Sequence, residues 1–448
     1  MRLLDAFDIH PGEVVSIIGA GGKTSLMIGL GYELAESGSR VLATTTVGID
    51  EHLLALVPVA LPITAPPESI SQALNEQRFV FLYEGVRSGR VQGADPAHIQ
   101  AILDAVDSDV LLIEADTSNS LPVKAPYEHE PVIPAGTSLV IPVVSFGAYG
   151  KPLDEDNIYN ARAIIERYGF PEGAPIKSAW LAQILRDETI GLRGVPDRVR
   201  VVAFLNQTPV KGYGRFRARV VAQLAMRSAR ISGVVLGEIR GAQPVYEIQR
   251  PVGAVLLAAG ASTRMGQHKL LLPWADGRTI IEHIVFQLIK SRVDPIVVVT
   301  GHNAREIKAL LKPLDLEIVH NKGYKTGEML SSLKVGLEAL PAHTASALVA
   351  LGDQPGIQPK TIYQLLTAYA LHGADLIVPS FQKQRGHPMM IGRRHWPEIL
   401  NLEGRSTLRD VLNRHAERIH YVEVDNDSVL RDVDTPQDYR DERFRAGL

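Results

Sequence analysis

The sequence predicts an α/β protein of two domains, each a mainly parallel sheet flanked by helices. The chain has 448 residues, more than one hydrophobic core of ordinary size accommodates. Short runs of β-branched residues alternate with helical patterns, which is typical of parallel α/β sheets. This rhythm restarts after residue 250, and each half opens with a strand, a glycine-rich loop and a helix. We therefore expect domains at 1–240 and 251–448, joined by a linker at 241–250.

In the first domain, strands are expected where apolar β-branched residues cluster: 14–18, 40–44, 79–83, 110–114, 138–144, 199–205 and 231–236. Helical patterns lie between them, for example at 23–37 and 157–168. In the second domain, the same criterion predicts strands at 252–257, 295–300, 316–319, 345–351 and 376–379. Helices are expected at 279–291, 304–311, 328–340, 360–371 and 405–414. The linker is predicted from the turn-forming sequence Gly-Ala-Gln-Pro and the polar stretch after it.

The composition excludes several classes of protein. Hydrophobic residues make up 45% of the chain and charged residues 22%, which is typical of a globular protein. A net charge of −3 without a run of Lys or Arg argues against binding to nucleic acid or to an anionic membrane. The absence of Cys excludes disulfides and thiolate ligands. With no signal peptide and no membrane span, we expect a cytoplasmic protein.

The strongest motif is the loop that follows the first strand of the second domain, LAAGASTRMG at 257–266. Two glycines allow backbone N–H groups to approach a phosphate closely. Arg264 and Lys269 add positive charge where a triphosphate is negative, so both are predicted catalytic residues. A simple tight turn is the weaker interpretation, because it does not explain these two cations.

Two aspartates are candidate metal ligands in the same domain. Asp353 ends the apolar run 347–351 just after a Gly, so it is expected at the carboxyl end of a buried strand, where it could hold Mg²⁺. A turn or cap role for Asp353 is equally compatible with the local sequence. Thr435 and Pro436 predict the start of a helix, with Thr435 as the N-cap. That leaves Asp434 as a second candidate ligand, with a structural role as the alternative.

A second phosphate-binding loop is predicted in the first domain, where Gly22, Lys23 and Thr24 follow a strand and open a helix. It is not a complete P-loop, because Ile17 replaces the first glycine of that motif. The acidic strand end 114–116 is a candidate Mg²⁺ site or an ordinary strand terminus. The segment 124–131 contains Glu-His-Glu, for which a metal site and a Pro-braced loop with solvated charges both remain open.

These motifs resemble two families. Residues 251–448 resemble the molybdenum cofactor nucleotidyltransferases (MobA-like), in particular the cytidylyltransferase branch (MocA), through 257–269, 327–336, 352–355, 386–388 and 432–436. The resemblance implies a Rossmann-like nucleotidyltransferase domain with Mg²⁺ on Asp353. It implies nucleotide binding by the following residues: Leu257, Ala258, Ala259, Gly260, Ser262, Gly266, Ser331, Ser332 and Gln354. His387, in the family's Gly-His-Pro, is implied as a substrate-binding residue. The segment 403–409 departs from the family's pattern in a region connected with recognition of the pterin.

Residues 1–240 resemble the selenium-dependent hydroxylase accessory proteins (YqeC) through 19–24, 44–46 and 124–134. That resemblance implies a P-loop-like domain with a part in cofactor maturation. Together the two resemblances imply transfer of CMP from CTP to a molybdopterin-type cofactor with release of pyrophosphate. Ala259 favours CTP over GTP, because its methyl group takes space that a purine would use. The alternatives are another phosphate acceptor, such as a sugar phosphate, or a cofactor carrier that assists an apo molybdenum hydroxylase as its partner.

Overall fold

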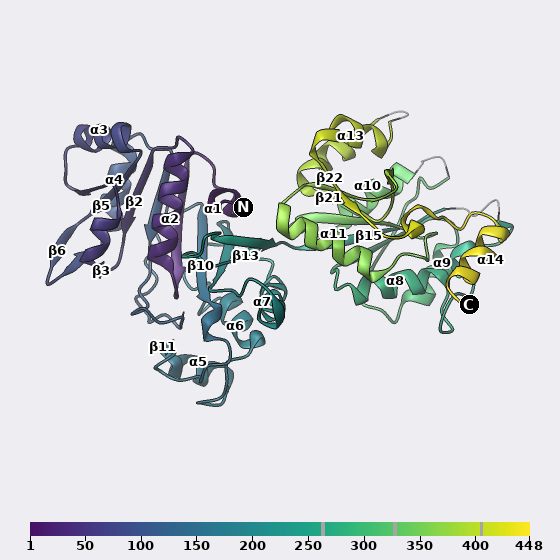
Figure 1. Ribbon diagram of the computed structural model, residues 1–448, viewed down its shortest axis with the longest axis horizontal. Coiled ribbons are helices and arrows are strands. Elements are labelled where there is room, and N and C mark those ends of the chain that lie inside the picture. The colour runs from purple at the N-terminus through teal and green to yellow at the C-terminus, as the bar shows by residue number, and fades with distance from the viewer. Residues whose placement is uncertain (261–264, 326–328, 404–405) are drawn as a thin grey trace. The chain divides into compact units, whose positions relative to one another are not determined.

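The chain folds into two compact units, Met1–Gln249 and Arg250–Leu448, which Figure 1 shows as ribbons. The computed structural model describes residues 1–260, 265–325, 329–403 and 406–448. Both units are α/β, and each contains a mainly parallel sheet between helices, so the predicted fold class is confirmed.

The sheet of the N-terminal unit has nine strands, and its neighbours run parallel except for β14 against β13. The two additions to the seven predicted strands are β4 and β14. In sheet order the strands are β14 (Val245–Gln249), β13 (Gly233–Gly237), β12 (Arg200–Asn206), β10 (Leu139–Ser145), β1 (Glu13–Gly19), β8 (Val110–Glu114), β2 (Val41–Thr45), β5 (Phe79–Tyr83) and β4 (Val59–Pro62).

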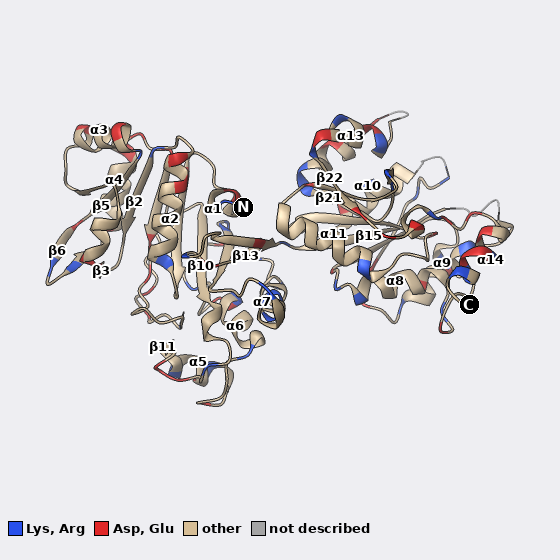
Figure 2. Ribbon diagram, viewed as in Figure 1, with Lys and Arg blue, Asp and Glu red and all other residues tan. Residues whose placement is uncertain are grey.

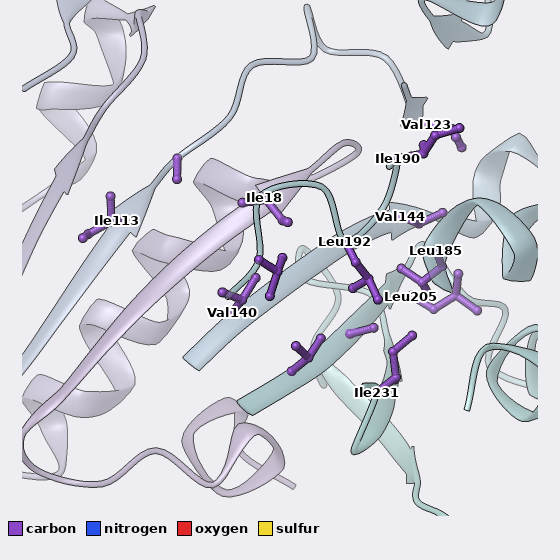
Figure 3. Close-up of a cluster of buried hydrophobic side chains, with 14 of the residues drawn as sticks. Ile18, Ile113, Val123, Val140, Val144, Leu185, Ile190, Leu192, Leu205 and Ile231 are labelled. Carbon is purple, nitrogen blue, oxygen red and sulfur yellow. The ribbon is translucent and has the colours of Figure 1, made fainter. Parts of the chain in front are cut away.

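Helices cover both faces of this sheet. One face packs on α1 (Leu3–Phe7) and α2 (Lys23–Glu36). The other face packs on α3 (Pro67–Gln77), α4 (Pro96–Ala105), α5 (Ala161–Tyr168), α6 (Ser178–Arg186) and α7 (Gly212–Ala225). Figure 3 shows part of this second core, where Val144 and Leu205 from the sheet lie near Leu185 of α6. Burial on both faces explains why the central strands are almost uninterrupted apolar runs.

Short elements complete the N-terminal unit. A small three-stranded sheet contains β3 (Ile49–Asp50), β6 (Gly85–Arg87) and β7 (Arg90–Gln92). A two-stranded pairing joins β9 (Val123–Lys124) to β11 (Ile158–Tyr159). Two 3-10 helices are η1 (Glu51–Leu56) and η2 (Phe146–Ala148).

Half of the segment predicted as a linker, 241–250, is part of the sheet. Residues 245–249 form β14, which pairs antiparallel with β13. The polar composition misled the prediction, because Val245 and Ile248 are buried and Glu247 is buried too, in ion pairs with Arg215 and Arg219. The Gly-Ala-Gln-Pro turn therefore closes a hairpin.

The sheet of the C-terminal unit has eight strands. In sheet order they are β17 (Glu317–His320), β16 (Ile296–Thr300), β15 (Val252–Ala258), β18 (Ser346–Leu351), β21 (Met389–Gly392), β19 (Leu376–Phe381) and β20 (Gln384–Arg385), with β22 (Ile419–Glu423) paired to β19. The strands β15 to β18 run parallel, whereas β21 is antiparallel to both its neighbours. The predicted strands are all present, and β20, β21 and β22 were not foreseen.

Two helical layers cover this second sheet. One layer contains α8 (Ile280–Lys290), α9 (Ala304–Leu311) and α11 (Pro359–His372). The other contains α10 (Met329–Ala339), α12 (Trp396–Leu400) and α13 (Leu408–Arg414). The remaining helix is α14 (Pro436–Arg445), and the 3-10 helices are η4 (Lys269–Leu271), η5 (Arg393–His395), η6 (Ala416–Arg418) and η7 (Asp427–Leu430). Within the described ranges, no helix has the length and apolar character that crossing a membrane requires.

Candidate active site

In the C-terminal unit, the loops that follow β15, β16 and β18 meet at the carboxyl ends of these neighbouring parallel strands. The N–H of His302, just after β16, donates to the carbonyl of Ala259 at 3.3 Å. The N–H of Gly352, just after β18, donates to the carbonyl of Leu257 at 2.9 Å. A Cβ atom on Gly301 would lie 2.6 Å from the Ala259 oxygen, so this close approach requires glycine. Open α/β sheets bind ligands at this edge.

Lys269 joins the two candidate metal ligands. Its Nζ lies 2.7 Å from Asp353 Oδ2 and 2.8 Å from Asp434 Oδ1. Burial lowers the pKa of Lys269, but the two carboxylates outweigh that effect and the net shift is upward, so the side chain is an ammonium ion. Since both oxygens bind one nitrogen, they are close enough to each other to share one cation.

A third carboxylate lies beside this pair. Burial raises the pKa of Asp432, and the charges of Asp353 and Asp434 raise it further. The amide of Gln354 donates to Asp432 at 2.7 Å, and Gln354 is 2% exposed. The oxygens of Asp353 and Asp434 that bind Lys269 are donors that suit a hard divalent cation, and Asp432 adds negative charge beside them. Gln354, which we expected at the nucleotide, is buried against Asp432.

The local sequence explains how Asp434 comes to face Lys269. Thr435 caps α14 and forms a capping box with Asp438, as the sequence predicted. The N–H of Val433 donates to the Asp353 carbonyl at 2.8 Å, which fixes the two chain segments side by side. The cap thus uses Thr435 and Asp438, while the Asp434 carboxylate accepts from Lys269.

Asn321, which the sequence analysis did not single out, binds the two serines predicted to contact the nucleotide. Its amide nitrogen lies 2.8 Å from Ser331 Oγ and 3.0 Å from Ser332 Oγ at the start of α10. The N–H of Asn321 donates to Thr300, so the amide is anchored next to the loop that touches Ala259. Its place two residues after the predicted strand 316–319 could have revealed it.

His387 lies close enough to Asp353 for their charges to interact. Burial lowers the pKa of His387 to about 4, while Asp353 acts in the opposite direction. Its backbone N–H donates to Val429 at 2.9 Å. The imidazole is therefore neutral at pH 7, which suits a hydrogen-bonding contact.

The other expected nucleotide-binding residues differ in position. Leu257 and Ala258 are the last residues of β15, and Ala258 is 1% exposed. Ala259 and Gly260 begin the loop, where Ala259 is half-buried and Gly260 exposed, and Gly266 has a φ of 69°. The predictions for Ser262 and Arg264 concern residues outside the described ranges.

In the N-terminal unit, the predicted phosphate loop connects β1 to α2. Gly22, with φ 134°, precedes the first helical residue, Lys23. A Cβ atom on Gly22 would lie 2.3 Å from the Asn206 amide, so glycine is required there. The Thr24 hydroxyl donates to Glu114 Oε2 at 2.6 Å, and Lys23 Nζ donates to Ser118 Oγ at 3.0 Å. The loop and the acidic strand end therefore form one cluster.

Buried charges extend this cluster. Burial lowers the pKa of Lys23 and raises those of Glu114 and Asp116. Lys124 Nζ binds Asp116 Oδ1 at 2.5 Å and Glu130 Oε2 at 2.8 Å. Lys124 and Glu130 are thus not solvated charges of a surface loop.

The Glu-His-Glu segment does not converge on one ion. Glu128 and His129 are exposed, whereas Glu130 is buried against Lys124.

Fold and site together define a two-domain protein in which each unit carries a glycine loop and acidic groups at the carboxyl end of a parallel sheet, a nucleotide-binding arrangement. Comparison with known families agrees. Residues 15–162 match the family described as YqeC protein, and residues 254–419 match the MobA-like NTP transferase domain. The chain belongs to the YqeC family through its N-terminal domain and has a MobA-like NTP transferase domain at its C-terminus.

Three relatives illustrate this composition. The uncharacterized protein YqeC of Escherichia coli is 34% identical over 200 residues, 43% of this chain and 75% of that protein. The molybdenum cofactor cytidylyltransferase of Escherichia coli is 28% identical over 190 residues, 42% of this chain and 93% of that protein. The nicotine blue oxidoreductase of Paenarthrobacter nicotinovorans is 34% identical over 193 residues, 41% of this chain and 92% of that protein.

Proposed function

We propose that the C-terminal unit transfers CMP from CTP to a molybdopterin-type molybdenum cofactor and releases pyrophosphate. The observation that carries the proposal is the contact of Lys269 with both Asp353 and Asp434 next to a glycine loop. The likeness to a molybdenum cofactor cytidylyltransferase over nearly the whole length of that enzyme supports the acceptor. Ala259, in a half-buried position of the loop, supports a pyrimidine over a purine base.

Asp353 and Asp434 would hold a magnesium ion, with Asp432 beside them. The ion would neutralise charge on the triphosphate and on the departing pyrophosphate. The donor set is all oxygen and partly exposed, with 26% of the Asp353 side chain and 44% of the Asp434 side chain accessible. These features suit Mg²⁺, which binds through one or two carboxylates and keeps several waters.

The residues of the chain would mainly bind and position two anions. A phosphate oxygen of the pterin forms a bond to the α-phosphorus of CTP, and the bond from that phosphorus to pyrophosphate breaks. A phosphate monoester is already anionic near pH 7, so the site needs little base catalysis. Lys269 would shift from the carboxylates to the phosphate oxygens when a metal arrives, and neutral His387 would donate to the acceptor.

The decisive experiment incubates the purified chain with Mg²⁺, molybdenum cofactor and each nucleoside triphosphate in turn. We expect pyrophosphate and a cytosine dinucleotide from CTP alone. Preference for GTP would overturn the interpretation of Ala259, and pyrophosphate release only with a sugar phosphate would overturn the acceptor. Stable binding of cofactor and of an apo molybdenum hydroxylase without any pyrophosphate would instead support a carrier. If the chain instead shows oxidoreductase activity and releases no pyrophosphate from any nucleotide, this result would contradict nucleotidyl transfer.

We propose a second binding function for the N-terminal unit, in support of cofactor maturation: it binds the phosphates of a nucleotide with a divalent cation. The hydrogen bond between Thr24 and Glu114 supports this, because a hydroxyl at a helix start beside a strand-end carboxylate can bind one magnesium ion. Fluorescent ATP and GTP analogues titrated into the full chain test it. Lys23→Ala should abolish binding, whereas exposed Lys151→Ala should not; equal binding by both variants would refute the site.

A further inference from the structure

Three metal-binding side chains converge in the C-terminal unit away from the active-site carboxylates. His395, Glu398 and His415 each offer one ligand atom, and these atoms lie within 4.8 Å of one another. His395 ends η5 and Glu398 lies three residues later in α12, so they share one side of a continuous helical segment. His415 directly follows α13. The site thus connects two helices.

The position of the site is set by the core beneath it. Trp396 and Ile399 of α12 and Val411 of α13 are buried in the same apolar cluster. The indole of Trp396 donates to the Ile391 carbonyl at 3.1 Å, which fixes the start of α12 on the sheet. The three ligands therefore lie on rigid elements, as a metal site requires.

One of the two imidazoles has an unsatisfied nitrogen. His395 is 3% exposed, and its Nε2 atom is buried without a hydrogen-bond partner among the described residues. Leaving a buried polar atom unsatisfied costs about 1–3 kcal/mol. Its ring lies edge-on to the ring of His415, with the centroids 4.8 Å apart. A bound cation would give this nitrogen the partner that the protein does not supply.

The carboxylate of Glu398 is held in a fixed orientation beside the two imidazoles. Arg414 binds one oxygen, Oε1, at 2.7 Å, and this contact fixes the carboxylate plane. The second oxygen, Oε2, lies 2.8 Å from His415 Nε2. Partners of this kind commonly orient metal ligands. Because Arg414 holds Oε1, the other oxygen, Oε2, is directed toward His415 and is available to an ion that both side chains would bind.

We propose that His395, Glu398 and His415 bind a zinc ion, or another late first-row divalent cation, that clamps α12 to α13. Two imidazoles and one carboxylate are a common zinc set, whereas magnesium prefers oxygen ligands alone. Zinc holds nitrogen at about 2.0–2.1 Å, so the three side chains, whose ligand atoms lie within 4.8 Å of one another, would adjust their positions around the ion. This metal is distinct from the magnesium of nucleotidyl transfer, and the proposal does not depend on that activity.

Cobalt titration of the full chain tests the proposal. The protein, without a histidine tag, is stripped with a chelator and titrated with Co²⁺, which absorbs visible light strongly when nitrogen and oxygen ligands surround it in four-coordination. We expect one equivalent to bind with such a band and zinc to displace it. Asp353→Asn should leave the band unchanged, because the active-site carboxylates are a separate site.

His415→Gln and Glu398→Gln should each weaken binding by at least about 100-fold, since even the partners of metal ligands change affinity by 10–100-fold. The matched control is His420→Gln, at a stacked pair with His372 whose centroids are 4.3 Å apart. That variant should bind like the wild type. Zinc should also raise the Tm of the wild type and of His420→Gln, but not that of His415→Gln. Absence of a cobalt band in the wild type, or an equal band in His415→Gln, would overturn the proposal.

Discussion

Replacing Lys269 by Met should change catalysis and metal binding in opposite directions. The ammonium of Lys269 lies between Asp353 and Asp434, where we place the magnesium ion. Before substrate binds, the ammonium therefore competes with the metal for the two carboxylates. After CTP binds, it stabilises the negative charge of the triphosphate. Met keeps the length of the side chain and removes only its charge and hydrogen bonds.

The free energy of each Lys269 contact follows from how far the side chains are exposed to water. The Lys269 side chain is 10% exposed, that of Asp353 26% and that of Asp434 44%. A hydrogen bond between charged groups contributes about 1.5–3 kcal/mol when shielded from water, so we assign that to Asp353. The contact with the more exposed Asp434 contributes under about 1 kcal/mol. Because about 1.4 kcal/mol corresponds to a factor of ten, loss of this competition should tighten metal binding at least about tenfold.

In Lys269→Met the transition state also loses the ammonium that would stabilise the phosphate charge, so kcat should fall by about 100-fold or more. Pyrophosphate release at saturating CTP measures kcat, and Mn²⁺ titration without nucleotide measures metal affinity. The control is Lys360→Met, which removes an exposed ammonium paired with Asp425. An unchanged kcat would remove Lys269 from catalysis. Weaker metal binding would contradict the competition between ammonium and metal.

Three further predictions concern base choice, pH and stability. Ala259→Gly should lower the preference for CTP over GTP by about tenfold in kcat/KM, because it removes the methyl group that takes the space of a purine; an unchanged ratio would place discrimination elsewhere. The pKa of His387 falls to about 4 on folding, so the unfolded chain binds more protons and stability should drop between about pH 6.5 and pH 4, by at most about 3 kcal/mol. Urea unfolding of the wild type and of His387→Gln tests this, since the variant should lose that part of the pH dependence. Lys124→Met leaves two carboxylates buried without their ammonium and should cost about 3–5 kcal/mol in the same urea unfolding, whereas loss of the exposed pair of Arg162 and Glu166 should have a much smaller effect.

Figure 2 colours the charged residues along the ribbon, and these residues include both exposed and buried groups. Sequence composition did not separate them. Glu247 follows a polar stretch, yet it is 0% exposed and paired with Arg219 at 2.6 Å. Such pairs depend on a neighbouring strand and helix, so the local pattern suggested a linker where a strand lies.

Local patterns predicted the elements and their ends. The apolar run before Asp353 and the cap at Thr435 are properties of a few consecutive residues, and both were confirmed as strand end and helix start. The glycine loop at the start of the N-terminal unit follows from the same kind of local chemistry, because Gly19, Gly21 and Gly22 have positive φ angles that glycine adopts without strain.

The sequence by itself therefore determined that this is a two-domain α/β protein with glycine loops and acidic strand ends in both halves. Only the tertiary structure decided which groups meet. Lys269 reaches Asp353 across 84 residues and Asp434 across 165 residues of sequence, and His395 meets His415 only because α12 and α13 share a core. The physical reason is that periodicity and capping act over a few residues, whereas ion pairs and metal sites depend on the order and direction in which distant strands assemble.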